Sequence, residues 1–195
     1  MKKPLLVSYF EPFGGDRLNS SAVVATQARG LLGAEDIIWV ELPVSYEQSV
    51  RRVSELIAAH DPVAVVALGQ AAGRSALSFE RQAQNLSNAA ALDSDGHQGA
   101  GVILEGAPPT LATSLPIDLM ARAASESGCP AEFSDSAGGY VCNHLFYHLQ
   151  LLGDRPSGFI HLPLVGEQAA EYPQGPTLAS ELLVLGLSAS LGILR

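Results

Sequence analysis

The sequence predicts an α/β fold around a largely parallel sheet. Short apolar runs typical of buried strands alternate with amphipathic segments of helix length, which is the pattern of strands joined by crossover helices. Residues able to bind a ligand or take part in a reaction follow these runs. They lie at the carboxyl ends of strands, where open parallel sheets bind ligands. A chain of 195 residues can bury one core without disulfides, so we expect a single domain over residues 1–195.

The first half of the chain predicts the order strand, helix, strand, helix, strand. The apolar strands are residues 5–9, 37–42 and 63–68, and the helices between them are residues 20–32 and 46–60. Asn19 or Ser20 can cap the first helix with a side-chain oxygen. This order is typical of successive crossover units in a parallel sheet.

The second half is less regular. Residues 77–84 look like a strand with polar alternate positions, and residues 87–101 form a loop rich in Ala, Asp, Ser and Gly. The remaining elements are helices at residues 117–127, 143–152 and 176–191 and a short strand at residues 158–162.

Composition narrows the class of partner. A net charge of -9 argues against nucleic acid and anionic membranes, which select clusters of Lys and Arg. No apolar run reaches the roughly 18 residues of a membrane helix, and two cysteines make no disulfide framework. We therefore expect a cytoplasmic protein that acts on a small molecule or peptide. With 47% hydrophobic and 16% charged residues, some apolar surface is expected to cover a homo-oligomer interface.

Cys142 is the first candidate for chemistry. It follows a glycine-containing turn in Ser134–Asn143 and precedes an amphipathic helical pattern, so it is expected at or near a helix N-terminus. There the free N–H groups and the helix dipole favour a nucleophilic thiolate. The alternative is that Cys142 is a small buried hydrophobe, as many free cysteines are.

A cysteine nucleophile needs a base. His161 lies at the end of a predicted strand, just before a proline turn, and is the best placed of the five histidines, although it could also be a core residue. His60 is expected to interact with a helix C-terminus, and His97 falls in the glycine-rich loop. His144 and His148 have the i, i+4 spacing of metal ligands, but no third ligand is evident, so no metal site is expected.

The base in turn needs a carboxylate that orients it. Glu80 lies between apolar neighbours on the strand-like segment and is the leading candidate, with an ion pair to Arg74 or Arg81 as its alternative role. Glu11 competes with it, but its position beside Pro12 and a Gly-Gly turn favours a role in shaping the loop.

Five segments together resemble, in order and approximate spacing, the pyrrolidone carboxyl peptidases, also called pyroglutamyl peptidase I. They are Phe10–Gly15, Gly69–Arg74, Phe79–Asn85, Ser134–Asn143 and Gly158–Pro163. The resemblance spans essentially the whole chain. It implies a three-layer α/β/α sandwich and a cytoplasmic enzyme, commonly a homotetramer, that needs no cofactor.

The resemblance also implies a reaction and its residues. It predicts a cysteine peptidase that removes an N-terminal pyroglutamate through a thioacyl intermediate, with Cys142 as nucleophile, His161 as base and Glu80 as orienting carboxylate. Phe10 and Phe13 are expected to line the pocket for the pyrrolidone ring.

Gln70 and Tyr140 are further positions expected in the pocket wall or as hydrogen-bonding groups. A neutral lactam needs an apolar box with a few amide partners and no counter-ion. A pocket without an acid should therefore reject a charged ring nitrogen, as in prolyl amides, because an unpaired ammonium there would be desolvated.

The chain departs from the family pattern near the site. Ala90 stands where an arginine is usual, ten residues beyond Glu80, and Ala91 stands where an aliphatic is frequent. Tyr9 replaces a usual glycine, and Ser20 a common proline. The alternative function is therefore a catalytically weak homologue that binds a lactam or a peptide N-terminus without efficient turnover.

Overall fold

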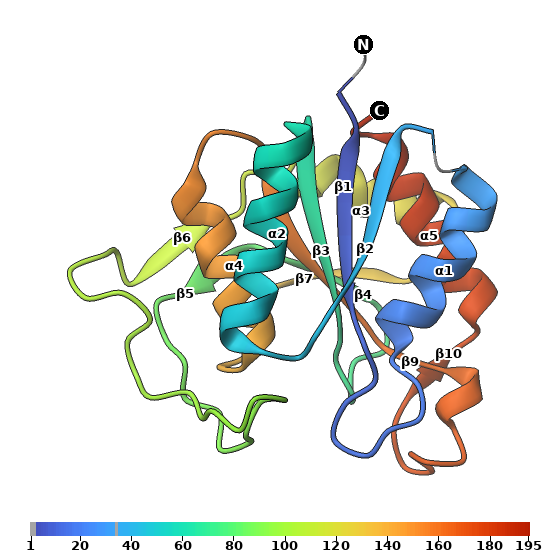
Figure 1. Ribbon diagram of the computed structural model, residues 1–195. Coiled ribbons are helices and arrows are strands. Elements are labelled where there is room, and N and C mark those ends of the chain that lie inside the picture. Colours follow the sequence, from blue (N-terminus) through green and yellow to red (C-terminus); the bar gives the residue numbers. More distant parts are fainter. Residues whose placement is uncertain (1–2, 34) are drawn as a thin grey trace.

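The computed structural model describes residues 3–33 and 35–195, and its centre is a six-stranded sheet (Figure 1). The strand order is β2-β1-β3-β8-β4-β7, and the first four strands run parallel. β4 runs antiparallel to β8, and β7 runs parallel to β4. The strands are β1 Leu5–Phe10, β2 Ile37–Leu42, β3 Ala64–Gln70, β4 Leu77–Glu80, β7 Ala131–Ser134 and β8 Ser157–Leu162.

Helices cover both faces of this sheet (Figure 1). One core joins the sheet to α1 (Ser20–Leu32), α3 (Ile117–Glu126) and α5 (Ser180–Gly192). A second core joins it to α2 (Tyr46–His60) and α4 (Val141–Leu152). The predicted three-layer α/β/α sandwich with a mostly parallel sheet is confirmed.

The apolar periodicity located most elements to within a few residues. α1, α2 and β2 have the expected bounds, and β1, β3 and β8 differ by one or two residues. α4 begins two residues earlier than expected, at Val141, and α1 and α2 are capped by the side chains of Asn19 and Ser45. The local capping rules thus describe these helix starts well.

Two expectations in the second half of the chain are wrong in detail, and one strand was missed. The predicted strand over 77–84 is broken at Arg81, where the chain leaves the sheet and continues as β5 (Gln82–Gln84), paired with β6 (Thr110–Ala112). β7 was not predicted, because four residues with a half-exposed pattern carry little periodic signal. The terminal helix starts later than expected, because Thr177–Leu178 pairs as β10 with β9 (Leu164–Val165) after the 3-10 turn Gly166–Gln168.

The loop over residues 87–101 is fixed to the body of the protein. Ser87 and Gly101 form an isolated β-bridge, and Leu92 and Gln98 form another. The Tyr140 hydroxyl donates to the Leu92 carbonyl at 2.7 Å. The described helices include none with the length and apolarity to cross a bilayer.

Candidate active site

The sheet brings Glu80 and His161 together. Ser78 on β4 pairs with His161 on the antiparallel strand β8, so Glu80, two residues along, shares that face with His161 as its diagonal neighbour. Glu80 Oε1 lies 2.7 Å from His161 Nδ1, and both side chains are buried. The short antiparallel strand β4 therefore places the Glu80 carboxylate beside the His161 imidazole.

Cys142 reaches the same region from the helix layer. It is the second residue of α4, at the helix start where the sequence placed it, so its sulfur lies beside free N–H groups of the first turn. A groove of about 320 Å³ is lined by both Cys142 and His161, together with Arg74 and Gly138. Thiol and imidazole thus face one common space.

Gly69 allows the helix to lie this close to β3. A Cβ at this position would lie 2.9 Å from the Cys142 sulfur and 2.8 Å from the Phe159 ring. Both separations are shorter than side-chain carbons tolerate. The absence of a side chain at Gly69 therefore leaves room for the sulfur.

Glu80 is held in its ionised form. Burial, the largest influence, would raise its pKa, but the hydrogen bond and charge of His161, the Ser134 hydroxyl and the Arg74 charge together lower it. Arg74 Nη2 lies 3.0 Å from the same Oε1 that contacts His161. The ion pair with Arg74 expected as an alternative role is thus present together with the histidine contact.

The imidazole is kept neutral and in one tautomer. Burial lowers the pKa of His161 and the Arg74 charge adds to this effect, against the opposing influence of Glu80. An ionised carboxylate only accepts hydrogen bonds, so the proton must lie on Nδ1. Nε2 is then free to accept a proton, which is the state a general base requires.

The Cys142 sulfur rests as a thiol. Burial and then the charge of Glu80 raise its pKa to about 12, and the helix N-terminal N–H only partly offsets them. The bias toward a thiolate expected from the helix start is opposed here, because burial and the Glu80 charge have the larger effect on the pKa.

A second cavity of about 160 Å³ adjoins Cys142 on the other side. Its wall is mainly aromatic and aliphatic: Phe10, Phe13, Asp16, Asn19, Val44, Gln70, Tyr140, Val141 and Cys142. The rings of Phe13 and Tyr140 lie 5.8 Å apart, and Tyr46 packs edge-on against Tyr140 at 5.6 Å. All four residues that the sequence indicated for the pocket, Phe10, Phe13, Gln70 and Tyr140, are in this wall.

Known proteins resemble this chain in sequence and in the arrangement of their elements. The family model described as pyroglutamyl peptidase matches residues 3–194. The pyrrolidone-carboxylate peptidase of Lactobacillus johnsonii is 36% identical over 193 residues, covering 96% of this chain and 90% of that protein. The Yersinia pestis protein of the same name is 36% identical over 197 residues, covering 97% and 91%. The chain belongs to the pyroglutamyl peptidase family.

Solved structures of this cysteine peptidase family superimpose closely on the fold. Pyroglutamyl peptidase I from Bacillus amyloliquefaciens gives a TM-score of 0.90 at 32% identity, with 97% of this chain and 93% of that chain covered. Pyrrolidone carboxyl peptidase from Pyrococcus furiosus gives 0.88 at 29% identity, with 97% of each chain covered.

The observed cavity wall differs from the wall expected from the sequence in one residue, Asp16. An uncharged wall was predicted, yet Asp16 contributes a carboxylate to it. No sequence signal marked this residue, since an acid just after a Gly-Gly turn is ordinary in a loop. Arg74 and Asn19 were likewise not singled out for the site, although they line the groove and the cavity respectively.

The other candidates lie elsewhere. The Glu11 carboxylate accepts from the Val44 N–H at 3.3 Å, in keeping with a role in loop shape. Cys129 is buried and packs closely against Gly186 of α5, and burial raises its pKa to about 11. His144 packs between Tyr46 and His148, with ring centroids 5.1 and 4.7 Å away.

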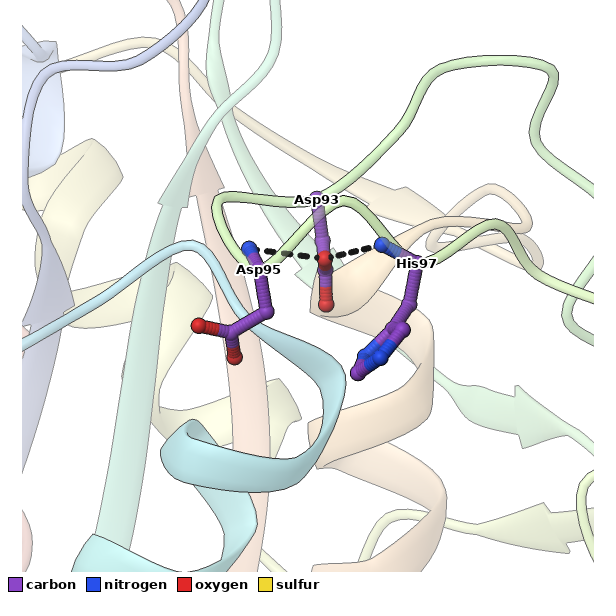
Figure 2. Close-up of side chains that lie close together, drawn as sticks. All are labelled: Asp93, Asp95 and His97. Atoms are coloured by element: carbon purple, nitrogen blue, oxygen red, sulfur yellow. Dashed lines mark hydrogen bonds between the residues drawn. The ribbon is translucent and has the colours of Figure 1, made fainter.

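The loop brings Asp93, Asp95 and His97 together, as Figure 2 shows. Asp93 Oδ1 accepts from the backbone N–H groups of Asp95 and His97, at 3.0 and 2.8 Å. Its other oxygen accepts from the Tyr46 N–H at the start of α2, at 2.9 Å. These contacts dock the loop onto the helix N-terminus, and a metal ion is not needed to explain them.

The two departures in the loop lie apart from the pocket wall. Ala90 and Ala91 are exposed, and neither belongs to the residues that line the cavity or the groove. The Ala90 carbonyl accepts a hydrogen bond from the Gln98 side chain at 3.2 Å. Ala90 therefore leaves the Glu80, His161 and Cys142 arrangement unaltered.

Proposed function

We propose that this protein is an exopeptidase that removes N-terminal pyroglutamate from peptides. The observation that supports it most is that Cys142 lines two spaces: a cavity of about 160 Å³ with aromatic walls and a more open groove that His161 also lines. A pyrrolidone ring fits the first, and the following peptide can leave through the second. Comparable activity is named for the relatives that share the fold.

Cys142 is the proposed nucleophile, His161 the base and Glu80 the group that orients it. When the scissile carbonyl reaches the sulfur, His161 Nε2 takes the thiol proton as the carbon–sulfur bond forms. His161 then gives that proton to the leaving amine, and water hydrolyses the thioacyl group to free pyroglutamate and the thiol. The raised pKa of the Cys142 thiol favours attack and proton transfer in one step.

The N-terminus of α4 supplies charge stabilisation. The first-turn N–H groups of α4 lack helix partners, so those near Cys142 are the donors expected to meet the carbonyl oxygen as it becomes negative. This backbone contribution needs no side chain from the loop. It therefore does not depend on the arginine that Ala90 replaces, and it argues against the alternative of a homologue without efficient turnover.

Phe10, Phe13 and Tyr140 form the proposed walls for the ring, with Phe10 almost fully buried. Gln70 is fixed at the cavity edge, because its Oε1 accepts from the Ser20 N–H and from Gln168 Nε2, each at 2.8 Å. A preformed cavity of this kind binds a rigid ring with little loss of side-chain entropy.

The test is hydrolysis of a chromogenic pyroglutamyl amide by the purified protein. We expect cleavage that a thiol alkylator abolishes, loss of activity in Cys142→Ser, and retained activity in the matched variant Cys129→Ser. Absence of cleavage by the folded wild-type protein would refute the proposal. Full activity of Cys142→Ser would refute the assignment of the nucleophile.

The oligomeric state and the cellular location are also proposals. Exposed apolar side chains, among them Leu92, Val102 and Leu104, support assembly into a homo-oligomer, and the family resemblance predicts a tetramer. The same resemblance predicts a cytoplasmic location. Light scattering on the purified protein would measure the oligomeric mass, and a monomeric mass would contradict the first expectation.

A further inference from the structure

The groove that Cys142 and His161 both line has one permanent cation in its wall. Part of that wall consists of residues with small side chains: Ala71, Ser136, Ala137 and Gly138. Arg74 lines the same groove, and burial lowers the pKa of His161, which favours its neutral ring. Among the described residues of this wall, Arg74 therefore carries the one fixed positive charge that an occupant of the groove meets.

The Arg74 guanidinium is held in place through one of its three nitrogens. Nη2 donates to Glu80 Oε1 and to the Ser136 carbonyl, each at 3.0 Å. Nε and Nη1 have no hydrogen-bond partner among the described residues, and neither is a buried atom. The side chain is 22% exposed. Two donor nitrogens of a fixed cation are thus accessible to a ligand, and little side-chain entropy is lost when one binds.

Arg74 lies at the end of the groove where the leaving amine is released. Its Nη2 and the His161 Nδ1 both contact the same oxygen of Glu80, so guanidinium and imidazole are neighbours. In the proposed reaction His161 gives its proton to the leaving amine, which places that nitrogen beside the ring. In a dipeptide substrate the α-carboxylate is only two bonds from this nitrogen. Carboxylate and cation are thereby brought to the same end of the groove.

We propose that Arg74 binds the α-carboxylate of the residue after pyroglutamate, so that pyroglutamyl dipeptides with a free carboxylate are the preferred substrate class. The inference rests on the proposed function and specifies its substrate. A guanidinium N–H bonds a carboxylate more strongly than a neutral carbonyl, which is what a longer peptide presents at this position. The overall field does not produce such a preference, since a net charge of -9 repels an anionic substrate.

The test compares kcat/KM for pyroglutamyl-alanine, pyroglutamyl-alaninamide and pyroglutamyl-alanyl-alanine. All three present the same ring and the same scissile bond. We expect the wild-type protein to cleave the dipeptide acid about tenfold more efficiently than either of the others, the effect of a charged hydrogen bond over a neutral one. The tripeptide keeps the carboxylate but moves it by one residue, so it separates the position of the charge from its presence.

Arg74→Gln should lower the ratio of kcat/KM for the dipeptide acid to that for its amide by about tenfold. Each ratio is taken within one protein, so a loss of kcat from disturbing Glu80 and His161 cancels. The intrinsic difference between the two leaving amines is also the same in every variant. Arg81→Gln removes the same charge from an exposed side chain that pairs with Asp135 and does not line the groove, and it should leave the ratio unchanged.

Other outcomes overturn the inference in distinguishable ways. Equal kcat/KM for the dipeptide acid and its amide in the wild-type protein refutes it and leaves the proposed function standing, and this comparison does not depend on a variant folding. Equal values for the dipeptide and the tripeptide refute the position of the bound carboxylate. An unchanged ratio in active Arg74→Gln refutes the role of Arg74. Cleavage of no pyroglutamyl substrate refutes the proposed function itself.

Discussion

Arg74 Nη2 lies 3.0 Å from Glu80 Oε1, the same oxygen that contacts the His161 ring at 2.7 Å. One carboxylate oxygen thus receives a permanent cation and a neutral imidazole together. Arg74 also donates to the Ser136 carbonyl at 3.0 Å, which fixes its guanidinium beside the turn before α4. The cation therefore connects the orienting acid with the turn that presents Cys142.

Replacing Arg74 by alanine should lower kcat by roughly tenfold and shift the acid limb of the pH–rate profile upward. The sign follows from charge, since Arg74 lowers the pKa of Glu80 and of His161, and both values rise when it is removed. Arg81→Ala, which removes an exposed cation paired with Asp135, is the matched control and should leave the limb in place. An unshifted acid limb in Arg74→Ala would contradict the electrostatic role.

Glu80→Gln should reduce kcat by about a thousandfold with a small change in KM. A glutamine amide can donate to His161 Nδ1, which moves the imidazole proton to Nε2 and removes the acceptor for the thiol. Steady-state kinetics measure the effect, and circular dichroism controls for the fold. Retention of wild-type kcat would show that the imidazole does not need this orientation.

Gly69→Ala should slow both turnover and alkylation of Cys142, because the new methyl group would lie 2.9 Å from the sulfur and displace it. Gly30→Ala in α1 is the matched control. A Cβ there meets open space, and alanine should stabilise the helix by about 0.5–1 kcal/mol. If Gly69→Ala reacts with iodoacetamide at the wild-type rate, the sulfur does not depend on that space.

The protein should lose stability as the pH falls from about 6.5 toward 4, in part because of His144. Burial and then the charge of His148 lower the pKa of His144 to about 4, so the folded state resists a proton that the unfolded chain binds. The contribution is on the order of 2 kcal/mol at the acid end. Thermal unfolding at pH 7 and pH 5 should show a smaller loss in His144→Gln than in wild type or His60→Gln, an exposed control.

Local sequence patterns predicted an α/β fold with a largely parallel sheet, and the family resemblance implied the three-layer sandwich. Apolar periodicity marked α1, α2 and β2, and strand-end or helix-start positions marked His161 and Cys142. It did not reveal that β4 runs against β8, since direction is set by pairing across the sheet and not by composition. Asp16 was not predicted in the cavity wall for a similar reason, because only the fold brings it to Tyr172 and Gln70.

The pKa of Cys142 could also not be predicted from the local sequence. The helix start favoured an anion, but the depth of the sulfur and the nearby Glu80 charge are tertiary properties with a larger effect. The sequence indicates that a helix dipole acts on the Cys142 thiol. It does not indicate how far the fold buries that thiol, which has the larger effect on its pKa.

That protonated thiol has a consequence for the lifetime of the protein. Oxidants such as peroxide attack thiolates far faster than thiols, so the raised pKa of Cys142 slows its oxidation relative to an exposed cysteine. The sulfur is most nucleophilic while His161 accepts its proton. The fold thereby slows the conversion of the Cys142 sulfur to sulfenic or sulfinic acid between substrates.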